Sequence, residues 1–177
     1  IRNRAARVAL HQRLRIGSPA IHADDLGLAP GVDTAILKLA TAGQLNSASL
    51  LVNGATAESA AAAWHCLPKA QPLVLHLCLT EGPQPLGCAD LPIGFSELLL
   101  SSLLPAKRCA LRAQIVTSVQ AQIHRFQQLT DQQQFQLDGH QHIHLLPLVL
   151  DVVLEQPEVA WVRTTAESLP QGLPLKL

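Results

Sequence analysis

Leu73-Val74-Leu75-His76-Leu77-Cys78-Leu79 is the stretch that decides the fold class, because it is a nearly continuous apolar run of strand length. Such runs are typical of strands in parallel sheets covered on both faces, whereas a half-exposed strand alternates apolar and polar residues. His76 interrupts the run. Taken alone, this side chain is either a hydrogen-bonded core histidine or a metal ligand.

Strand-like and helical segments alternate on both sides of this run. Further strands are predicted over 47–52, 135–137 and 159–162, and helices from Pro30 to Gly43 and over 56–66, 95–104, 107–129 and 147–155. The alternation favours an α/β fold with parallel strands and right-handed crossovers, in an open sheet or a barrel. A complete (β/α)8 barrel usually needs about 250 residues, so this chain is expected to supply a partial or distorted barrel.

Two of the predicted helices carry a clear apolar face. In the first, the apolar side chains at helical spacing are Val32, Ala35, Ile36, Leu39 and Ala40. In the long glutamine-rich helix they form a narrow stripe of Leu111, Ile115, Val119, Ile123 and Phe126. A stripe of this kind is enough to dock one side of a helix on a sheet.

Length and composition indicate one soluble unit. The 177 residues, 48% of them hydrophobic, can form a single domain over 1–177, with residues 1–20 a basic N-terminal arm. The alternative for this arginine-rich stretch is a transit peptide. Thirteen basic and thirteen acidic residues cancel, which argues against nucleic acid or an anionic membrane as a partner. Four cysteines without a CxxC pair indicate free thiols and a cytoplasmic location.

Polar clusters accompany three of the predicted strands. Asp24 and Asp25 precede the first helix, and His140 begins a run of three histidines at alternate positions within 137–147. If that run is extended, its imidazoles project to one side. Because the carboxyl ends of parallel strands meet at one edge, His76 is expected near both clusters.

One carboxylate and two imidazoles with open positions suit a catalytic divalent cation, and a second carboxylate is then available as a base. Each cluster also has a structural explanation. The aspartates can cap a helix, and the histidines can be solvated at a helix entry. A metal site is the hypothesis that unites all three clusters.

Four successive segments carry a resemblance to a known family. They are Ala-Asp-Asp-Leu-Gly-Leu-Ala-Pro-Gly-Val (23–32), Ser-Leu-Leu-Val-Asn-Gly (49–54), His-Leu-Cys-Leu-Thr-Glu-Gly (76–82) and Leu-Asp-Gly-His-Gln-His-Ile-His-Leu-Leu-Pro (137–147). In this order they resemble the motifs of the YdjC-like carbohydrate deacetylases, which include chito-oligosaccharide deacetylases. The resemblance implies a distorted (β/α) barrel of the glycoside hydrolase/deacetylase type. It also implies a hydrolase that removes the N-acetyl group from an acetylated amino sugar or oligosaccharide.

The resemblance also implies roles for the matched residues. Asp25, His76 and His140 would bind one divalent metal ion, magnesium or zinc, and Asp24 would be the general base that activates its water. Asp138 would orient a ligating imidazole.

Other positions are expected to line the substrate. His142 and His144 are candidates for the proton donor. Asn53, Glu81 and Arg163 are expected to contact the sugar, although a surface salt bridge is an equal alternative for Arg163.

One motif of the resembling family is absent. Its late histidine, the apparent general acid, has no counterpart before Leu177. Either a histidine of the 140–144 run substitutes, or a C-terminal part is missing, or the chain is inactive. The rival hypotheses are therefore a metal-dependent phosphoesterase and a catalytically impaired sugar-binding relative. A homodimer is expected from the resembling family.

Overall fold

Five parallel strands form a single sheet. The computed structural model describes residues 21–68, 71–81, 86, 91 and 94–164, so the predicted basic arm over 1–20 lies outside the described residues. The strands, which neighbour one another in chain order, are β1 (His22–Leu26), β2 (Ser47–Leu50), β3 (Val74–Leu77), β4 (Phe135–Gly139) and β5 (Val159–Val162). All four pairings are parallel, as the sequence predicted.

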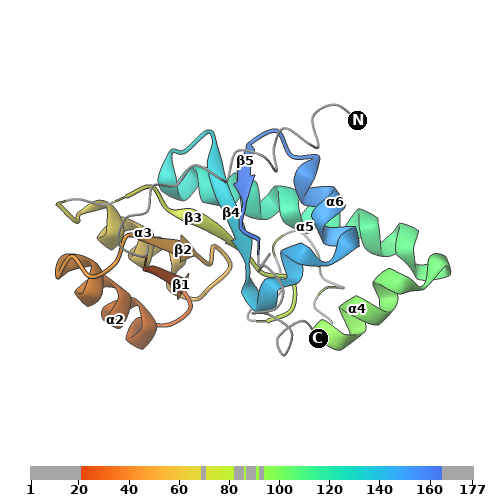
Figure 1. Cartoon of the computed structure of the whole chain (residues 1–177), viewed down its shortest axis with the longest axis horizontal. Coiled ribbons are helices and arrows are strands. Elements are labelled where there is room, and N and C mark those ends of the chain that lie inside the picture. The colour runs from red at the N-terminus through yellow and green to blue at the C-terminus, as the bar shows by residue number, and fades with distance from the viewer. Residues whose placement is uncertain (1–20, 69–70, 82–85, 87–90, 92–93, 165–177) are drawn as a thin grey trace, which may run out of the picture.

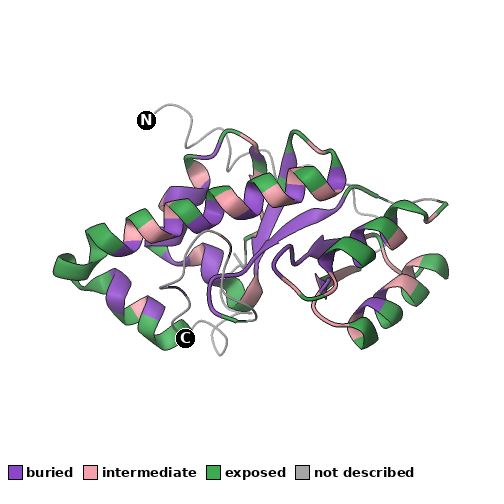
Figure 2. Ribbon diagram, turned by 180° about the vertical axis from the view of Figure 1, so that it is seen from behind, coloured by how far each residue is buried: buried purple, intermediate pink, exposed green. Residues whose placement is uncertain are grey.

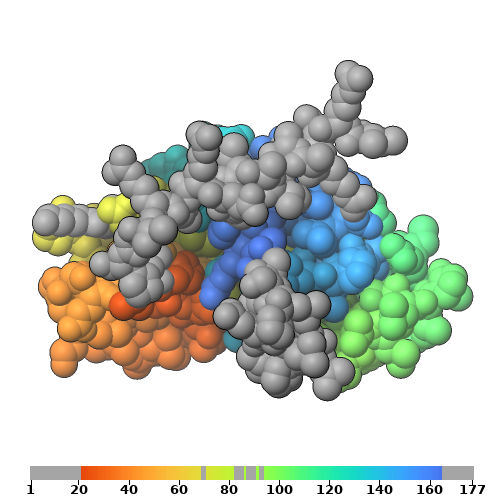
Figure 3. All heavy atoms as spheres, viewed as in Figure 1, coloured from red at the N-terminus to blue at the C-terminus, as the bar shows by residue number. Residues whose placement is uncertain are grey.

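Every pair of neighbouring strands is joined through helix. The helical elements are α2 (Pro30–Thr41), α3 (Ala57–His65), α4 (Phe95–Leu103), α5 (Pro105–Thr130), the 3-10 helix η2 (His140–Leu145) and α6 (Pro147–Leu154). Consecutive parallel strands with helical crossovers are the arrangement of a (β/α) barrel. Within the described residues β1 and β5 are the two edges of the sheet, so the barrel is partial. The molecule is elongated, with α2 at one end and α4 at the other (Figures 1 and 3).

The core lies between the sheet and the helices that cover it. All four residues of β3 are buried, as expected for a strand covered on both faces. The predicted stripe on α5 is confirmed, because Leu111, Ile115, Val119, Ile123 and Phe126 are all buried. Figure 2 shows the buried residues gathered in the strands and on the side of α5 that faces them.

Helix α2 buries only part of the predicted face. Ile36 is buried, and Val32 and Ala40 pack partly buried against the core, but Ala35 and Leu39 are exposed. Asp33, which was not predicted to face inward, is buried. Asp33 turns inward because its Oδ1 accepts a 2.6 Å hydrogen bond from the backbone N–H of Gly27. The buried N–H of Gly27, in the turn after β1, thereby has a hydrogen-bond acceptor. The spacing of apolar residues cannot predict that this N–H needs one.

Two turns at the carboxyl end of the sheet pack backbone against backbone. A Cβ atom added to Gly54 would lie 2.1 Å from the carbonyl oxygen of Gly27. The Asn53-Gly54 turn after β2 therefore needs glycine at its second position, because a side chain there would separate the β1 and β2 turns. In the described part of the chain, no helix combines the length and apolar character needed to cross a membrane.

Candidate functional site

Asp24 and Asp25 lie in a bulge of β1. Between Ala23 and Leu26, three steps along β1 pair with two steps along β2. Asp25 takes a left-handed backbone conformation with φ of 67°. Neighbouring side chains of a regular strand point to opposite faces, but the extra residue of a bulge re-aims one of them. The bulge therefore brings two adjacent carboxylates to the same end of the sheet.

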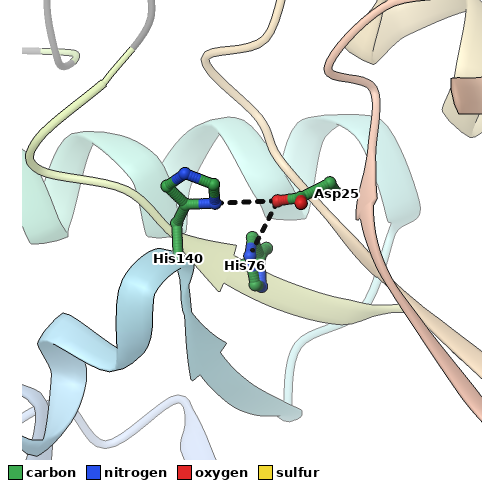
Figure 4. A group of neighbouring side chains, drawn as sticks. All are labelled: Asp25, His76 and His140. Atoms are coloured by element: carbon green, nitrogen blue, oxygen red, sulfur yellow. Dashed lines mark hydrogen bonds and ion pairs between the residues drawn. The ribbon is translucent and has the colours of Figure 1, made fainter.

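Asp25, His76 and His140 converge at this end of the sheet (Figure 4). Asp25 Oδ1 lies 3.1 Å from Nε2 of His76 and 2.8 Å from Nδ1 of His140. One ligand atom from each side chain lies within 4.8 Å of the other two. A carboxylate oxygen and two imidazole nitrogens, with room for further ligands, form a donor set that suits a divalent cation.

Each imidazole of this trio also has a carboxylate on its other ring nitrogen. His76 and Asp138 are register partners on β3 and β4, and His76 Nδ1 lies 2.7 Å from Asp138 Oδ1. His140 Nε2 lies 3.0 Å from Glu81 Oε2. A carboxylate behind a ligating histidine holds the ring and keeps the facing nitrogen available for the cation. The residues present therefore fit a divalent metal.

The buried pair of His76 and Asp138 dominates the electrostatics. Burial alone lowers the pKa of His76, but hydrogen bonds with Asp138 and Asp25 outweigh it and raise this pKa to about 9. Burial opposes ionisation of Asp138, yet hydrogen bonds from His22 and His76 hold its pKa far below the usual range. A hydrogen bond with His76 is the main cause of the lowered pKa of Asp25. A cation must therefore displace a proton from His76.

A second charged cluster stands beside the first. Ligand-type atoms of His22, Asp24 and Asp138 also lie within 4.8 Å of one another. Here Nη1 of Arg163 contacts both carboxylates, at 2.8 Å from Asp24 Oδ1 and 3.2 Å from Asp138 Oδ2. The hydrogen bond with His22 is the largest cause that lowers the pKa of Asp24 to about 2, and Arg163 adds to it. The guanidinium thus supplies the positive charge that a second cation would bring.

Comparison with known proteins agrees with the four sequence motifs. The family model for YdjC-like proteins matches residues 20–176. The chain belongs to the YdjC-like family. It is 37% identical over 164 residues to a carbohydrate deacetylase from Mus musculus, covering 86% of this chain and 51% of that protein. It is 30% identical over 160 residues to a chitooligosaccharide deacetylase from Serratia marcescens, covering 89% of this chain and 58% of that protein.

This YdjC-like chain thus spans about half the length of the curated relatives it matches. A crystal structure from Enterococcus faecalis, described as a cellobiose-phosphate cleavage protein, superposes with a TM-score of 0.57. It is 21% identical, and the match covers 88% of this chain and 62% of that one. At this identity the likeness supports the partial barrel and carries nothing about the reaction.

The histidine run of this YdjC-like protein is folded differently from the predicted extended chain. His140–Leu145 is a 3-10 helix, and Gln141 and His142 within it have φ values of 53° and 56°. The expectation that the three imidazoles project to one side is therefore wrong. Left-handed backbone at two consecutive residues breaks the alternation on which that expectation depended.

The two later histidines of the run occupy contrasting environments. His144 is fully buried, with its Nε2 2.9 Å from the carbonyl oxygen of Arg163. Its Nδ1 packs so closely on Gly139 that a Cβ atom there would lie 2.7 Å away. This packing disfavours the predicted role of His144 as proton donor, because a substrate cannot reach it. His142 is exposed, and its role remains a prediction.

Two of the three predicted sugar-contacting residues lie within the charged clusters. Glu81 forms a hydrogen bond with His140, and Arg163 contacts both Asp24 and Asp138. The third, Asn53, is only 7% exposed, and neither amide atom has a hydrogen bond among the described residues. A buried amide without partners is costly, so a polar group of a ligand would stabilise it. Substrate contact by Asn53 remains a prediction.

Three residues that contribute to the site were not predicted from the sequence: His22, Ser49 and Gln122. His22 precedes Asp24 by two positions on a strand, so strict alternation would have placed it on the same face. Gln122 is fully buried on α5, and its amide hydrogen-bonds both the N–H and the carbonyl of Cys78. These two hydrogen bonds hold the backbone just after the last residue of β3, two positions beyond His76. Its position, three residues after Val119 and four before Phe126, places Gln122 on the predicted apolar stripe, and this spacing is the signal that could have found it.

Proposed function

We propose that this protein is a metal-dependent carbohydrate deacetylase that hydrolyses the acetamide of an N-acetylated amino sugar or oligosaccharide. The observation that carries the proposal is the convergence of Asp25, His76 and His140, with a carboxylate behind each imidazole. Relatives described as deacetylases of carbohydrates and chito-oligosaccharides support the same reaction. The substrate class follows from those relatives rather than from the geometry.

Asp25, His76 and His140 would hold the cation. When bound, a divalent metal ion polarises the acetamide carbonyl and makes water a better nucleophile near neutral pH. Asp24 stands beside the ligand set and is ionised at neutral pH, so it can accept a proton from the attacking water. The leaving amine needs one proton, which Asp24 can return or the exposed His142 can supply.

The phosphoesterase alternative is less well supported. Two-metal phosphoesterases clamp the reacting oxygens between cations about 3.5–4 Å apart. The second cluster, which would have to hold the other cation, already contains the Arg163 guanidinium between Asp24 and Asp138. We therefore infer a single cation, and the amide substrate rests on the relatives described as deacetylases. A sugar-binding relative without turnover would have the same metal set, and only an activity measurement separates it from an enzyme.

The test is acetate release from N-acetylated chito-oligosaccharides by the metal-loaded protein. Wild type should release acetate, and Asp24→Asn should lower kcat at least about 100-fold because amide nitrogen and oxygen cannot take the proton. Asp131→Asn is the matched control, since Asp131 is exposed in the turn before β4 and should leave kcat unchanged.

Each outcome separates the hypotheses. Release of phosphate from phosphorylated sugars without release of acetate would support the phosphoesterase. Metal and sugar binding without either product would support the binding protein. Full activity in Asp24→Asn would remove Asp24 from the role of base.

A further inference from the structure

The imidazole of His22 is held at both ring nitrogens by hydroxyl groups of the neighbouring strand. His22 Nδ1 lies 2.6 Å from Ser47 Oγ, and His22 Nε2 lies 2.5 Å from Ser49 Oγ. His22 and Ser47 are register partners of β1 and β2, and Ser49 follows on the same face of β2. Because a hydroxyl group contacts each ring nitrogen, the orientation of the imidazole is fixed.

The position of one hydrogen atom follows from the partners of Ser49. Ser49 Oγ lies 2.7 Å from Asp138 Oδ2, and a carboxylate can only accept a hydrogen bond. The single hydroxyl hydrogen of Ser49 therefore points to Asp138. His22 must then donate to Ser49, so its Nε2 carries a hydrogen. This holds whether the imidazole is neutral or charged.

The same Nε2–H group faces Asp24. It lies 3.3 Å from Asp24 Oδ1, and Oδ1 also accepts a hydrogen bond from Arg163 Nη1 at 2.8 Å. Two donor groups, one from β1 and one from the residue after β5, thus contact one oxygen. In the described part of the chain, the other oxygen, Oδ2, has no hydrogen bond.

We infer that His22 is a positioning residue for Asp24, and that Asp24 Oδ2 is the atom that accepts the proton from water. His22 and Arg163 both contact Oδ1, which restricts the rotation of the carboxylate and leaves Oδ2 available to accept the proton. The inference rests on the proposed function, because that function makes Asp24 the base. None of the contacts of His22 involves the proposed metal ligands Asp25, His76 and His140.

Two substitutions distinguish the hydrogen bonds of His22 from the space that its ring fills. His22→Phe keeps a ring and removes both nitrogens, whereas His22→Gln can place an amide N–H near the position of Nε2. We expect His22→Phe to lower kcat about 10- to 100-fold, the cost of a misplaced catalytic group, with KM and cation affinity within about threefold. His22→Gln should restore kcat to within about threefold of wild type. His124→Phe, an exposed histidine of α5, is the matched control and should behave as wild type.

A kcat for His22→Phe within twofold of wild type would overturn the inference, as would equal losses in His22→Phe and His22→Gln. An equal loss in both variants accompanied by weaker cation binding would indicate a purely structural role. Thermal melts of both variants identify a failure to fold.

A second measurement does not depend on turnover. Long-range proton–nitrogen NMR correlation of histidine-labelled protein reports which ring nitrogens carry hydrogen. We expect His22 Nε2 to be protonated, and an unprotonated Nε2 would overturn the inference even in an active enzyme. If wild type releases no acetate while Nε2 is protonated, the proposed reaction fails and the hydrogen-bond arrangement stands.

Discussion

The two charged clusters at the carboxyl end of the sheet have similar residues and opposite organisation. In the cluster of Asp25, His76 and His140, both imidazoles face the carboxylate of Asp25, and a further carboxylate lies behind each imidazole. In the neighbouring cluster the carboxylates of Asp24 and Asp138 both face the guanidinium of Arg163. The first cluster lacks a permanent positive charge and the second contains one.

The guanidinium in one cluster and its absence from the other favour different roles for the two clusters. Carboxylate and neutral imidazole together attract a divalent cation, whereas a carboxylate already paired with arginine gains little from one. Adjacent residues of one bulge, Asp24 and Asp25, therefore belong to different clusters. In the proposed reaction Asp24 is the base and Asp25 is a metal ligand.

The largest expected effect is on cation affinity when a ligand is removed. His140→Ala should weaken binding of zinc or magnesium by more than about 100-fold, because one of three protein ligands is lost. His76→Ala should do the same. Isothermal titration gives the affinity, and circular dichroism confirms the fold.

Asp24→Asn in the neighbouring cluster is the contrasting variant for this experiment. It should change cation affinity less than about tenfold, because Asp24 lies outside the ligand set. Wild-type affinity in His140→Ala would mean that the first cluster is not the metal site.

The carboxylates behind the two imidazoles should differ in importance. Asp138 is 1% exposed, whereas the side chain of Glu81 is 53% exposed. Asp138→Asn should weaken cation binding about 10- to 100-fold, the usual cost of losing such a partner. Glu81→Gln should cost less than about tenfold, since water can replace an exposed partner. A larger loss in Glu81→Gln than in Asp138→Asn, measured by the same titration, would reverse this comparison.

Removal of Arg163 should make the second cluster resemble the first. Wild type should bind one equivalent of cation, whereas Arg163→Met should take up a second with a Kd on the order of 1 mM. Its kcat should also fall about tenfold, because Asp24 loses a contact to Oδ1. Equilibrium dialysis with metal analysis gives the stoichiometry. Two equivalents in wild type would contradict the role assigned to the guanidinium.

A separate prediction concerns stability against pH. The pKa of His76 is 6.5 in the unfolded chain and about 9 in the folded, metal-free protein. Below pH 6.5 both states hold the proton, and the contribution of His76 to stability is complete. Between pH 6.5 and 9 the unfolded chain releases its proton first, so the free energy of unfolding should fall, by on the order of 3 kcal/mol.

Urea unfolding of metal-free protein at several pH values measures this change. His76→Gln removes the titrating group and should flatten most of the slope, with the remainder due to His22, whose pKa is also raised. With saturating cation the sign should reverse, because protons then compete with the metal for His76. If the free energy of unfolding of wild type does not change between pH 6.5 and 9, the hydrogen bonds of His76 with Asp138 and Asp25 do not raise its pKa.

The fold was largely predictable because its signals are local. Each strand of the described sheet except β1 was anticipated from its apolar run, and the stripe on α5 from its spacing. The predictions failed where local contacts or backbone conformation depart from periodicity. On α2 the buried Asp33 accepts a hydrogen bond from Gly27 N–H, while Ala35 and Leu39 of the predicted face are exposed. After His140, two left-handed residues fold the chain into a 3-10 helix.

The sequence by itself determined which residue types stand at the carboxyl ends of the strands, and the order of its motifs determined the family. Only the tertiary structure decided the partner of each nitrogen and oxygen. The register of β3 and β4 pairs Asp138 with His76. The bulge in β1 directs Asp24 and Asp25 into different clusters. Arg163, which follows the edge strand β5, contacts Asp24 on the opposite edge strand. These are contacts between residues distant in sequence, and their geometry depends on strand register and burial rather than on local periodicity.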